Sequence, residues 1–134
     1  MIKRLAHICI HSDDLAETEN FYCDVLGLEK GFVFMKNGAL FGYYIRVGRE
    51  SFIEVFKGNS GAVGNIDHLA IETEDIDQVI SKLRSNGFDA TDKKLGCDKS
   101  WQSWTKDPSG VKIEFHQYTD ESLQFRGGEC EVDW

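Results

Sequence analysis

Two stretches of this chain decide its fold: RLAHICI at residues 4–10 and NIDHLAI at residues 65–71. Each is a short apolar run with a histidine near its centre, His7 in the first and His68 in the second. When the chain is aligned on these histidines, the flanking residues also match, and Gly27 corresponds to Gly87 one residue out of register. The sequence therefore predicts two similar halves.

A second pair of stretches repeats with nearly the same spacing. SFIEVF at residues 51–56 places Glu54 in an apolar run of the first half, and VKIEFH at residues 111–116 places Glu114 in the second. Each half thus carries one histidine and one glutamate at equivalent places. If the halves fold alike and face each other, these four side chains converge on one site.

The first half is predicted to form a strand, a helix and three further strands. In the strand at residues 4–11, alternation sets the histidines on one face and the isoleucines on the other. Ser12 or Asp13 is expected to cap a helix that runs to Leu26 and ends at Gly27. The later strands are predicted at residues 31–35, 41–47 and 51–56.

The second half shows the same order of elements more clearly. Thr73 or Asp75 is expected to cap a helix that Gly87 ends, and its apolar residues follow the i, i+3, i+4, i+7 spacing of one helix face. Asp107-Pro108-Ser109-Gly110 predicts a tight turn between the last two strands. The apolar stripe is Ile76, Val79, Ile80 and Leu83, and the strands are predicted near residues 89–93, 101–106 and 111–118.

The predicted fold class is α+β, with two tandem βαβββ modules whose sheets form a cupped, partly closed barrel around a metal site. All 134 residues are assigned to one domain. Within it, module one covers about residues 4–57 and module two about 65–118. A glycine-rich linker at residues 58–64 joins them, and the tail at residues 119–134 lies outside the repeat. This tail is expected to pack on the partner half or on a second subunit.

Composition narrows the class of protein. With 41% hydrophobic residues and a single proline the chain is globular, and 23 acidic against 15 basic residues give a net charge of −8. No basic block interrupts this acidity, which argues against nucleic acid or an anionic membrane as a partner. The four cysteines are scattered and nothing resembles a signal peptide, so reduced thiols and a cytoplasmic location are expected.

Strand alternation groups further residues with the four candidate ligands. A helix is expected to cover the opposite face of each sheet, which leaves the ligand face to line a cavity. His11, Phe52, Phe56, Trp104 and His116 are expected on that face as substrate-binding residues. Polar lining remains the alternative for the two histidines, and ordinary core packing for the three aromatic residues.

Bare imidazoles and carboxylates in a cavity would be costly unless a partner compensates for lost water. A divalent ion removes that cost, and His7, Glu54, His68 and Glu114 are therefore predicted as its ligands. Two imidazoles and two carboxylates suit Ni, Co, Mn, Fe or Zn. Such an ion polarises a substrate carbonyl, and Glu54 or Glu114 can take the proton from the adjacent carbon. The alternative for each His–Glu pair is a simple hydrogen bond.

These residues resemble the vicinal oxygen chelate superfamily, which comprises glyoxalases, bleomycin-resistance proteins and dioxygenases. The resemblance rests on motifs in both halves and spans about residues 4–118. The motifs are Leu5-Ala6-His7-Ile8, Asn20-Phe21-Tyr22, Leu26-Gly27-Leu28, Phe52-Ile53-Glu54-Val55, Asp67-His68-Leu69-Ala70 and the run from Asp107 to Glu114.

The complete set of two histidines and two glutamates is most similar to glyoxalase I, the lactoylglutathione lyase. The resemblance implies a metal-dependent lyase or isomerase in which Glu54 and Glu114 are ligands that also move the proton. It also implies Ni or Co as the favoured metal, a small-molecule substrate and a homodimer. A dioxygenase or an epimerase on the same fold, or a non-enzymatic small-molecule or drug-binding protein, is the alternative.

The chain departs from the glyoxalase I pattern at two places. That family typically has arginine four residues after the first histidine, where this chain has His11, and asparagine four residues after the first glutamate, where it has Gly58. A histidine is shorter than arginine and offers no bidentate clamp for a carboxylate. The resemblance therefore implies the chemistry without implying glutathione as the thiol.

Overall fold

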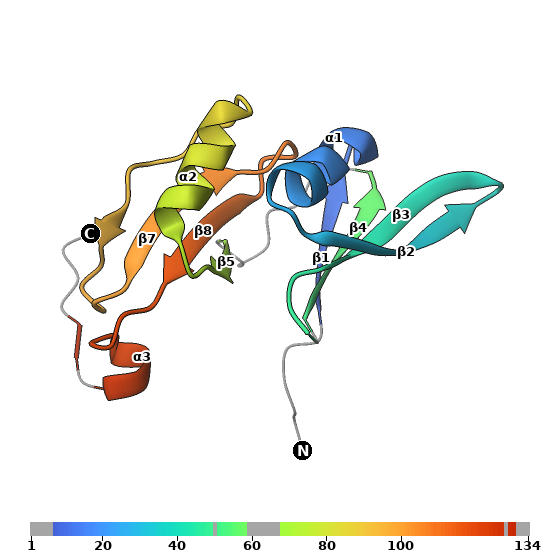
Figure 1. Cartoon of the computed structure of the whole chain (residues 1–134). Helices are drawn as coiled ribbons and strands as arrows, with labels where there is room; N and C mark the ends of the chain where they lie inside the picture. The colour runs from blue at the N-terminus through green and yellow to red at the C-terminus, as the bar shows by residue number, and fades with distance from the viewer. Residues whose placement is uncertain (1–6, 50, 59–67, 128, 131–134) are drawn as a thin grey trace, which may run out of the picture. The chain divides into compact units, whose positions relative to one another are not determined.

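The computed structural model describes residues 7–49, 51–58, 68–127 and 129–130 (Figure 1). The chain divides into two compact units, and each is described by itself. The first unit comprises residues 1–67 with the turn at 107–111, and the second comprises residues 68–106 and 112–134. Most of the linker at residues 58–64 and the predicted start of the first strand lie outside the described residues.

The first unit is built on a four-stranded sheet in the order β1-β4-β3-β2. β1 runs parallel to β4, whereas β4, β3 and β2 pair antiparallel. A parallel pair needs a crossover connection, and the helical segment between β1 and β2 begins it. The strands are β1 (His7–Ser12), β2 (Glu29–Lys36), β3 (Ala39–Arg46) and β4 (Phe52–Lys57).

The helical crossover consists of α1 (Leu15–Glu19) and the π-helical segment η1 (Asn20–Val25). Asp14 caps it, and its Oδ1 accepts hydrogen bonds of 3.0 Å from the backbone N–H groups of Ala16 and Glu17. The prediction of a cap at Ser12 or Asp13 is wrong, because the Ser12 hydroxyl is buried and lies 2.7 Å from the Thr18 hydroxyl. The helix stops before Gly27, whose φ of 75° favours glycine, as predicted.

The core of the first unit lies between this crossover and one face of the sheet. Alternate residues of β3 and β4 point into it, and aromatic residues of η1 cover them. This leaves the other face of the sheet, with Glu54, outside the core. The buried hydrophobic residues described in this unit are Ile10, Phe21, Tyr22, Val25, Tyr43, Ile45, Ile53 and Val55.

The second unit repeats the plan with the strand order β5-β8-β7-β6. β5 is parallel to β8, and α2 (Ile76–Ser85) supplies the crossover (Figure 1). Asp75 caps α2, with its Oδ1 2.9 Å from the Gln78 nitrogen, and Gly87 follows at φ 83° as predicted. The strands are β5 (Leu69–Glu72), β6 (Lys94–Leu95), β7 (Trp101–Lys106) and β8 (Lys112–Gln117).

The strand predicted at residues 89–93 is wrong, and only β6 pairs with β7 as a ladder at this edge. One backbone bond, from the Thr91 nitrogen to the Trp104 carbonyl at 3.0 Å, is present here, and side chains supply further bonds. The Thr91 hydroxyl accepts from the Trp104 nitrogen at 2.9 Å, and the Ser103 hydroxyl donates to the Thr91 carbonyl at 2.9 Å. Hydrophobic alternation detects extended chain but not which groups make its hydrogen bonds.

The tail folds back onto the second unit and includes α3 (Leu123–Arg126). The Leu123 nitrogen donates to the Asp98 carbonyl at 2.9 Å, and a disulfide joins Cys97 to Cys130. The expectation of four reduced thiols is therefore wrong for this pair, because docking of the tail brings together two cysteines that are distant in sequence. Among the described residues the free cysteines are Cys9 and Cys23.

The α+β class with two βαβββ modules is confirmed. The two sheets share no strand pair in the described part of the chain, so they are separate four-stranded sheets and not one hydrogen-bonded barrel. No helix in the described ranges is long and apolar enough to span a membrane.

Candidate metal-binding half-sites

His7 and Glu54 are the candidate half-site of the first unit. They lie on the neighbouring strands β1 and β4, where Cys9 pairs with Glu54 and His7 with Phe52. Alternation points both side chains away from the core, as the sequence predicts. The Nε2 atom of His7 lies 3.8 Å from Oε2 of Glu54, and the imidazole is 41% exposed.

Two further polar groups lie beside this half-site. Tyr44 pairs with Glu54 across β3 and β4, and its hydroxyl is 3.3 Å from Nδ1 of His7. Cys9 pairs with Glu54 on the other side. Burial raises the pKa of the Cys9 thiol to about 11, and its hydrogen bond to Glu54 and the charge of that carboxylate act in the same direction. Cys9 is thus a neutral thiol at neutral pH.

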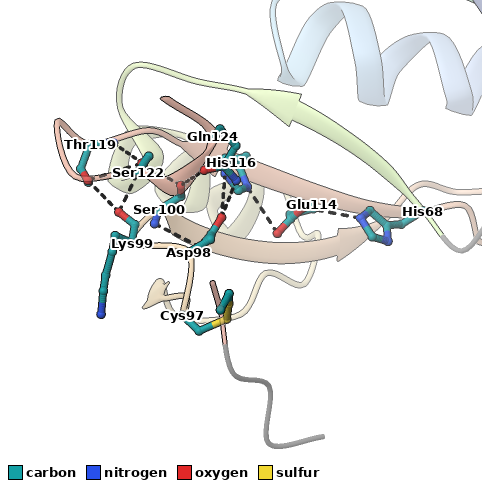
Figure 2. Close-up of polar contacts among 11 residues, drawn as sticks. His68, Cys97, Asp98, Lys99, Ser100, Glu114, His116, Thr119, Ser122 and Gln124 are labelled. Atoms are coloured by element: carbon teal, nitrogen blue, oxygen red, sulfur yellow. Dashed lines mark hydrogen bonds and ion pairs between the residues drawn. A yellow bond between two sulfur atoms is a disulfide. The ribbon is translucent and has the colours of Figure 1, made fainter. Parts of the chain in front are cut away.

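His68 and Glu114 form the half-site of the second unit (Figure 2). Nε2 of His68 lies 3.5 Å from Oε2 of Glu114, whose side chain is only 8% exposed. The Trp104 ring meets the His68 imidazole edge-on, with the centroids 4.8 Å apart, and Trp104 pairs with Glu114 across β7 and β8. The structure therefore brings His68, Glu114 and Trp104 together.

The other oxygen of Glu114 faces inward, toward His116. Nδ1 of His116 lies 3.5 Å from Oε1 of Glu114, and its Nε2 lies 3.6 Å from Oδ2 of Asp98 (Figure 2). His116 is buried, so it is placed behind Glu114 and not at the exposed surface of the half-site. Burial opposes the charge of Asp98, but hydrogen bonds from Gln124 and Ser100, together with His116, lower the pKa of this carboxyl.

Aromatic side chains cover the sheet face beside His7 and Glu54. The rings of Phe32 and Tyr44 stack with centroids 4.6 Å apart, and Phe34 contacts Phe56 at 4.8 Å. Phe52 approaches Tyr44 at 5.8 Å. We call these five residues the aromatic strip. Phe52 and Phe56, predicted from the sequence, belong to it, and His11 is an exposed residue of β1 that pairs with Phe56.

The donor sets fit a divalent metal ion. Two ligand atoms about 2.1 Å from one ion are separated by roughly 3.0 Å at right angles and roughly 3.4 Å at the tetrahedral angle. The separations of 3.8 Å in the first unit and 3.5 Å in the second are close to this range and exceed ordinary hydrogen-bond lengths. Each half-site supplies two donors, and no cluster of three or more potential ligands occurs within the ranges that the structure describes.

Sequence reasoning missed Tyr44, Cys9 and Asp98. A signal existed for the first two: once β1, β3 and β4 are paired in register, Cys9 and Tyr44 flank Glu54. Asp98 lies in a loop, where no periodicity indicates its partner.

Two βαβββ units, each with a histidine–glutamate pair on the sheet face opposite its helix, define a class of proteins built from a repeated module. The family model described as Glyoxalase/Bleomycin resistance protein/Dioxygenase superfamily matches residues 4–115, and the chain belongs to this superfamily. No curated protein matches the chain in sequence.

Solved structures with different activities share the fold. Lactoylglutathione lyase from Agrobacterium tumefaciens is 22% identical with a TM-score of 0.68, over 87% of this chain and 94% of that one. TnmS3, an antibiotic-binding protein from Streptomyces sp. CB03234, is 17% identical with a TM-score of 0.74, over 88% and 98%. The fosfomycin resistance protein FosX from Listeria monocytogenes is 19% identical with a TM-score of 0.71, over 90% and 98%. These likenesses show the fold alone.

Proposed function

We propose that this protein is a divalent-metal-dependent lyase or isomerase of the glyoxalase type, with His7, Glu54, His68 and Glu114 as the metal ligands. The observation that supports it is the repeated pair: Nε2 of a histidine lies 3.8 Å and 3.5 Å from a glutamate Oε2 at equivalent places in two modules. If each pair were only a local hydrogen bond, there would be no need for it to occur at the same strand positions in both modules.

When bound, the metal would polarise a substrate carbonyl and make the adjacent C–H more acidic. The chain's own carboxylates supply the base. Glu54 or Glu114 accepts the proton from that carbon and returns it to the former carbonyl carbon, while the hydroxyl proton of the first carbon moves to the former carbonyl oxygen, so the substrate is isomerised with no net change in atoms. The aromatic strip offers an apolar surface to the rest of the substrate. We further propose that the protein is a homodimer, that each site binds one small-molecule substrate, and that the metal is Ni or Co.

Proton transfer by Glu114 is tested with Glu114→Gln, which keeps the shape of the side chain and removes its basicity. The metal-loaded protein is assayed with hemithioacetals of 2-oxoaldehydes and a set of small thiols that includes glutathione, with solvent deuterium incorporation as a second readout. We expect a loss of activity of about 10²–10⁴-fold. Glu121→Gln, which removes an exposed carboxylate of the tail, is the control and keeps full activity. A Glu114→Gln rate equal to wild type contradicts the proposed role of Glu114.

A second function, capture of an aromatic small molecule without turnover, is favoured by the aromatic strip. Phe32 is 59% exposed and stacks on Tyr44, which leaves one ring face open for a planar ligand. Metal-free protein would then bind polycyclic aromatic compounds, and Phe32→Ala would weaken that binding by about tenfold. Phe125→Ala, which removes an exposed phenylalanine of the tail, is the control. Binding that requires metal, or that survives Phe32→Ala, contradicts this second function.

A further inference from the structure

The two modules differ in the residue that lies two positions after the glutamate on the same strand. In module one, the residue two positions after Glu54 is Phe56, a member of the aromatic strip. In module two, the equivalent residue after Glu114 is His116, a buried imidazole between two carboxylates. The repeat predicts an apolar residue at this position. His116 is therefore a difference between module two and module one.

We propose that His116, held by Asp98, is a positioning residue that fixes the Glu114 carboxylate with Oε2 presented to His68. The proposal rests on the proposed function, since Glu114 is the residue that it positions. The two oxygens of Glu114 have different neighbours: Oε1 is 3.5 Å from Nδ1 of His116, and Oε2 is 3.5 Å from Nε2 of His68. A contact on Oε1 restrains rotation of the carboxylate and so sets the direction of Oε2.

The burial of His116 gives its Nε2 atom a need for a polar partner that Asp98 can meet. Its Nε2 atom is shielded from solvent and has no hydrogen-bond partner among the described residues. A buried polar atom without a partner is unfavourable by about 1–3 kcal/mol. Oδ2 of Asp98 lies only 3.6 Å away, so a small movement completes the contact. The imidazole therefore lies between the carboxylates of Glu114 and Asp98.

Asp98 is itself held in place from several sides. Its Oδ2 accepts a hydrogen bond of 2.6 Å from the Gln124 side chain, and its Oδ1 accepts one of 3.2 Å from the Ser100 nitrogen (Figure 2). The disulfide at Cys97 anchors the preceding residue. The tail thus restrains the Asp98 loop, and the loop restrains His116. Glu54 in the first unit is flanked instead by Cys9 and Tyr44.

The test uses His116→Phe, which installs the residue that module one carries at this place, together with Asp98→Asn and the double variant. Each is loaded with Co(II), and its affinity is measured by competition with a chelating dye, with the visible spectrum of the bound ion as a second readout. We expect His116→Phe to weaken Co(II) binding by 10–100-fold and to shift the spectrum. Asp98→Asn weakens binding less, and the double variant is no worse than His116→Phe, because Asp98 acts through His116.

Glu121→Gln removes one negative charge from the same tail and should leave the Co(II) affinity within twofold of wild type. Urea unfolding of each metal-free variant shows whether it folds. An unchanged affinity and spectrum in folded His116→Phe overturn the positioning role, as does an additive loss in the double variant.

Failure of the proposed function gives a different result. If the wild type binds no Co(II), the proposed function fails, and the positioning role is decided in metal-free protein from the ring ¹⁵N resonances of His68. His116→Phe is expected to shift them, because the Glu114 oxygen that faces His68 is released, and Glu121→Gln is not. His68 resonances that are equal in wild type and His116→Phe overturn the proposal.

Discussion

Replacing Asp107 by alanine is expected to destabilise the first unit by about 3–5 kcal/mol. Oδ1 of Asp107 accepts hydrogen bonds from the nitrogens of Ser109 and Val111 at 2.9 and 2.8 Å, and Oδ2 accepts one from the Tyr22 hydroxyl at 3.1 Å. Each of the two turn bonds contributes about 1 kcal/mol net, and loss of the third leaves the buried Tyr22 hydroxyl without a partner, which costs about 1–3 kcal/mol. The turn joins β7 and β8, which carry Trp104 and Glu114.

Two variants dissect this loss. Tyr22→Phe removes the hydroxyl and leaves the turn bonds in place, so it should cost only about 1 kcal/mol. Asp107→Asn keeps an oxygen acceptor for the turn and a polar partner for Tyr22, so it should cost less than about 1 kcal/mol at neutral pH. The assay is urea unfolding monitored by circular dichroism. The slope of the unfolding free energy against urea concentration is compared between variants. A loss in Asp107→Ala no larger than in Tyr22→Phe would refute the role of the turn bonds.

The pH dependence supplies an independent check of the same carboxyl. Burial raises the pKa of Asp107 above its ordinary value of 3.8, and the hydrogen bonds that it accepts offset only part of that effect. The folded protein therefore holds this proton more tightly than the unfolded chain does. The resulting stability is fully present below pH 3.8 and is lost as the pH rises through the folded pKa. Asp107→Asn should accordingly gain stability relative to wild type between pH 4 and 7, and a constant difference would contradict this.

Three further changes are expected to alter stability, each measured by urea unfolding. Reduction of the Cys97–Cys130 disulfide, which spans 33 residues, should lower the free energy of unfolding by about 3–4 kcal/mol. The stability of the control Cys130→Ser should not depend on reductant. Equal stability of the wild type with and without reductant would show that the bond is absent. Gly42→Ala should cost about 1–3 kcal/mol, because its Cβ would lie 2.3 Å from the Val55 carbonyl oxygen, whereas Gly31→Ala on β2 meets only ordinary contacts and serves as the tolerated control. Asp14→Ala should cost about 1 kcal/mol through loss of its two cap bonds, and no change would contradict that cap assignment.

Strand alternation made the two half-sites predictable. It places His7 and Glu54 on the sheet face opposite the helix, and likewise His68 and Glu114. The internal repeat shows that the two pairs occupy equivalent positions. The helix ends at Gly27 and Gly87 were predictable too, since both glycines have positive φ values that other residues rarely adopt.

Contacts made by loops and by the tail were not predictable from local patterns. The Asp98–His116 contact depends on how the tail docks on the loop at residues 96–100, and nothing in the spacing of Asp98 indicates it. The same docking pairs Cys97 with Cys130. The cap at Asp14 was missed for a related reason, because neighbouring Ser12 has equal capping propensity and its hydroxyl is turned inward to Thr18.

We have proposed that His7, Glu54, His68 and Glu114 are ligands of the same metal ion, and the metal content of purified protein tests this proposal most directly. Wild type, His7→Ala and His68→Ala are each saturated with Ni or Co, freed of excess ion and analysed by elemental mass spectrometry. We expect about one ion per chain in the wild type and its loss in both variants, since each variant lacks one proposed ligand of the same ion. Two ions per chain with one retained in each variant, or no ion in the wild type, would contradict it.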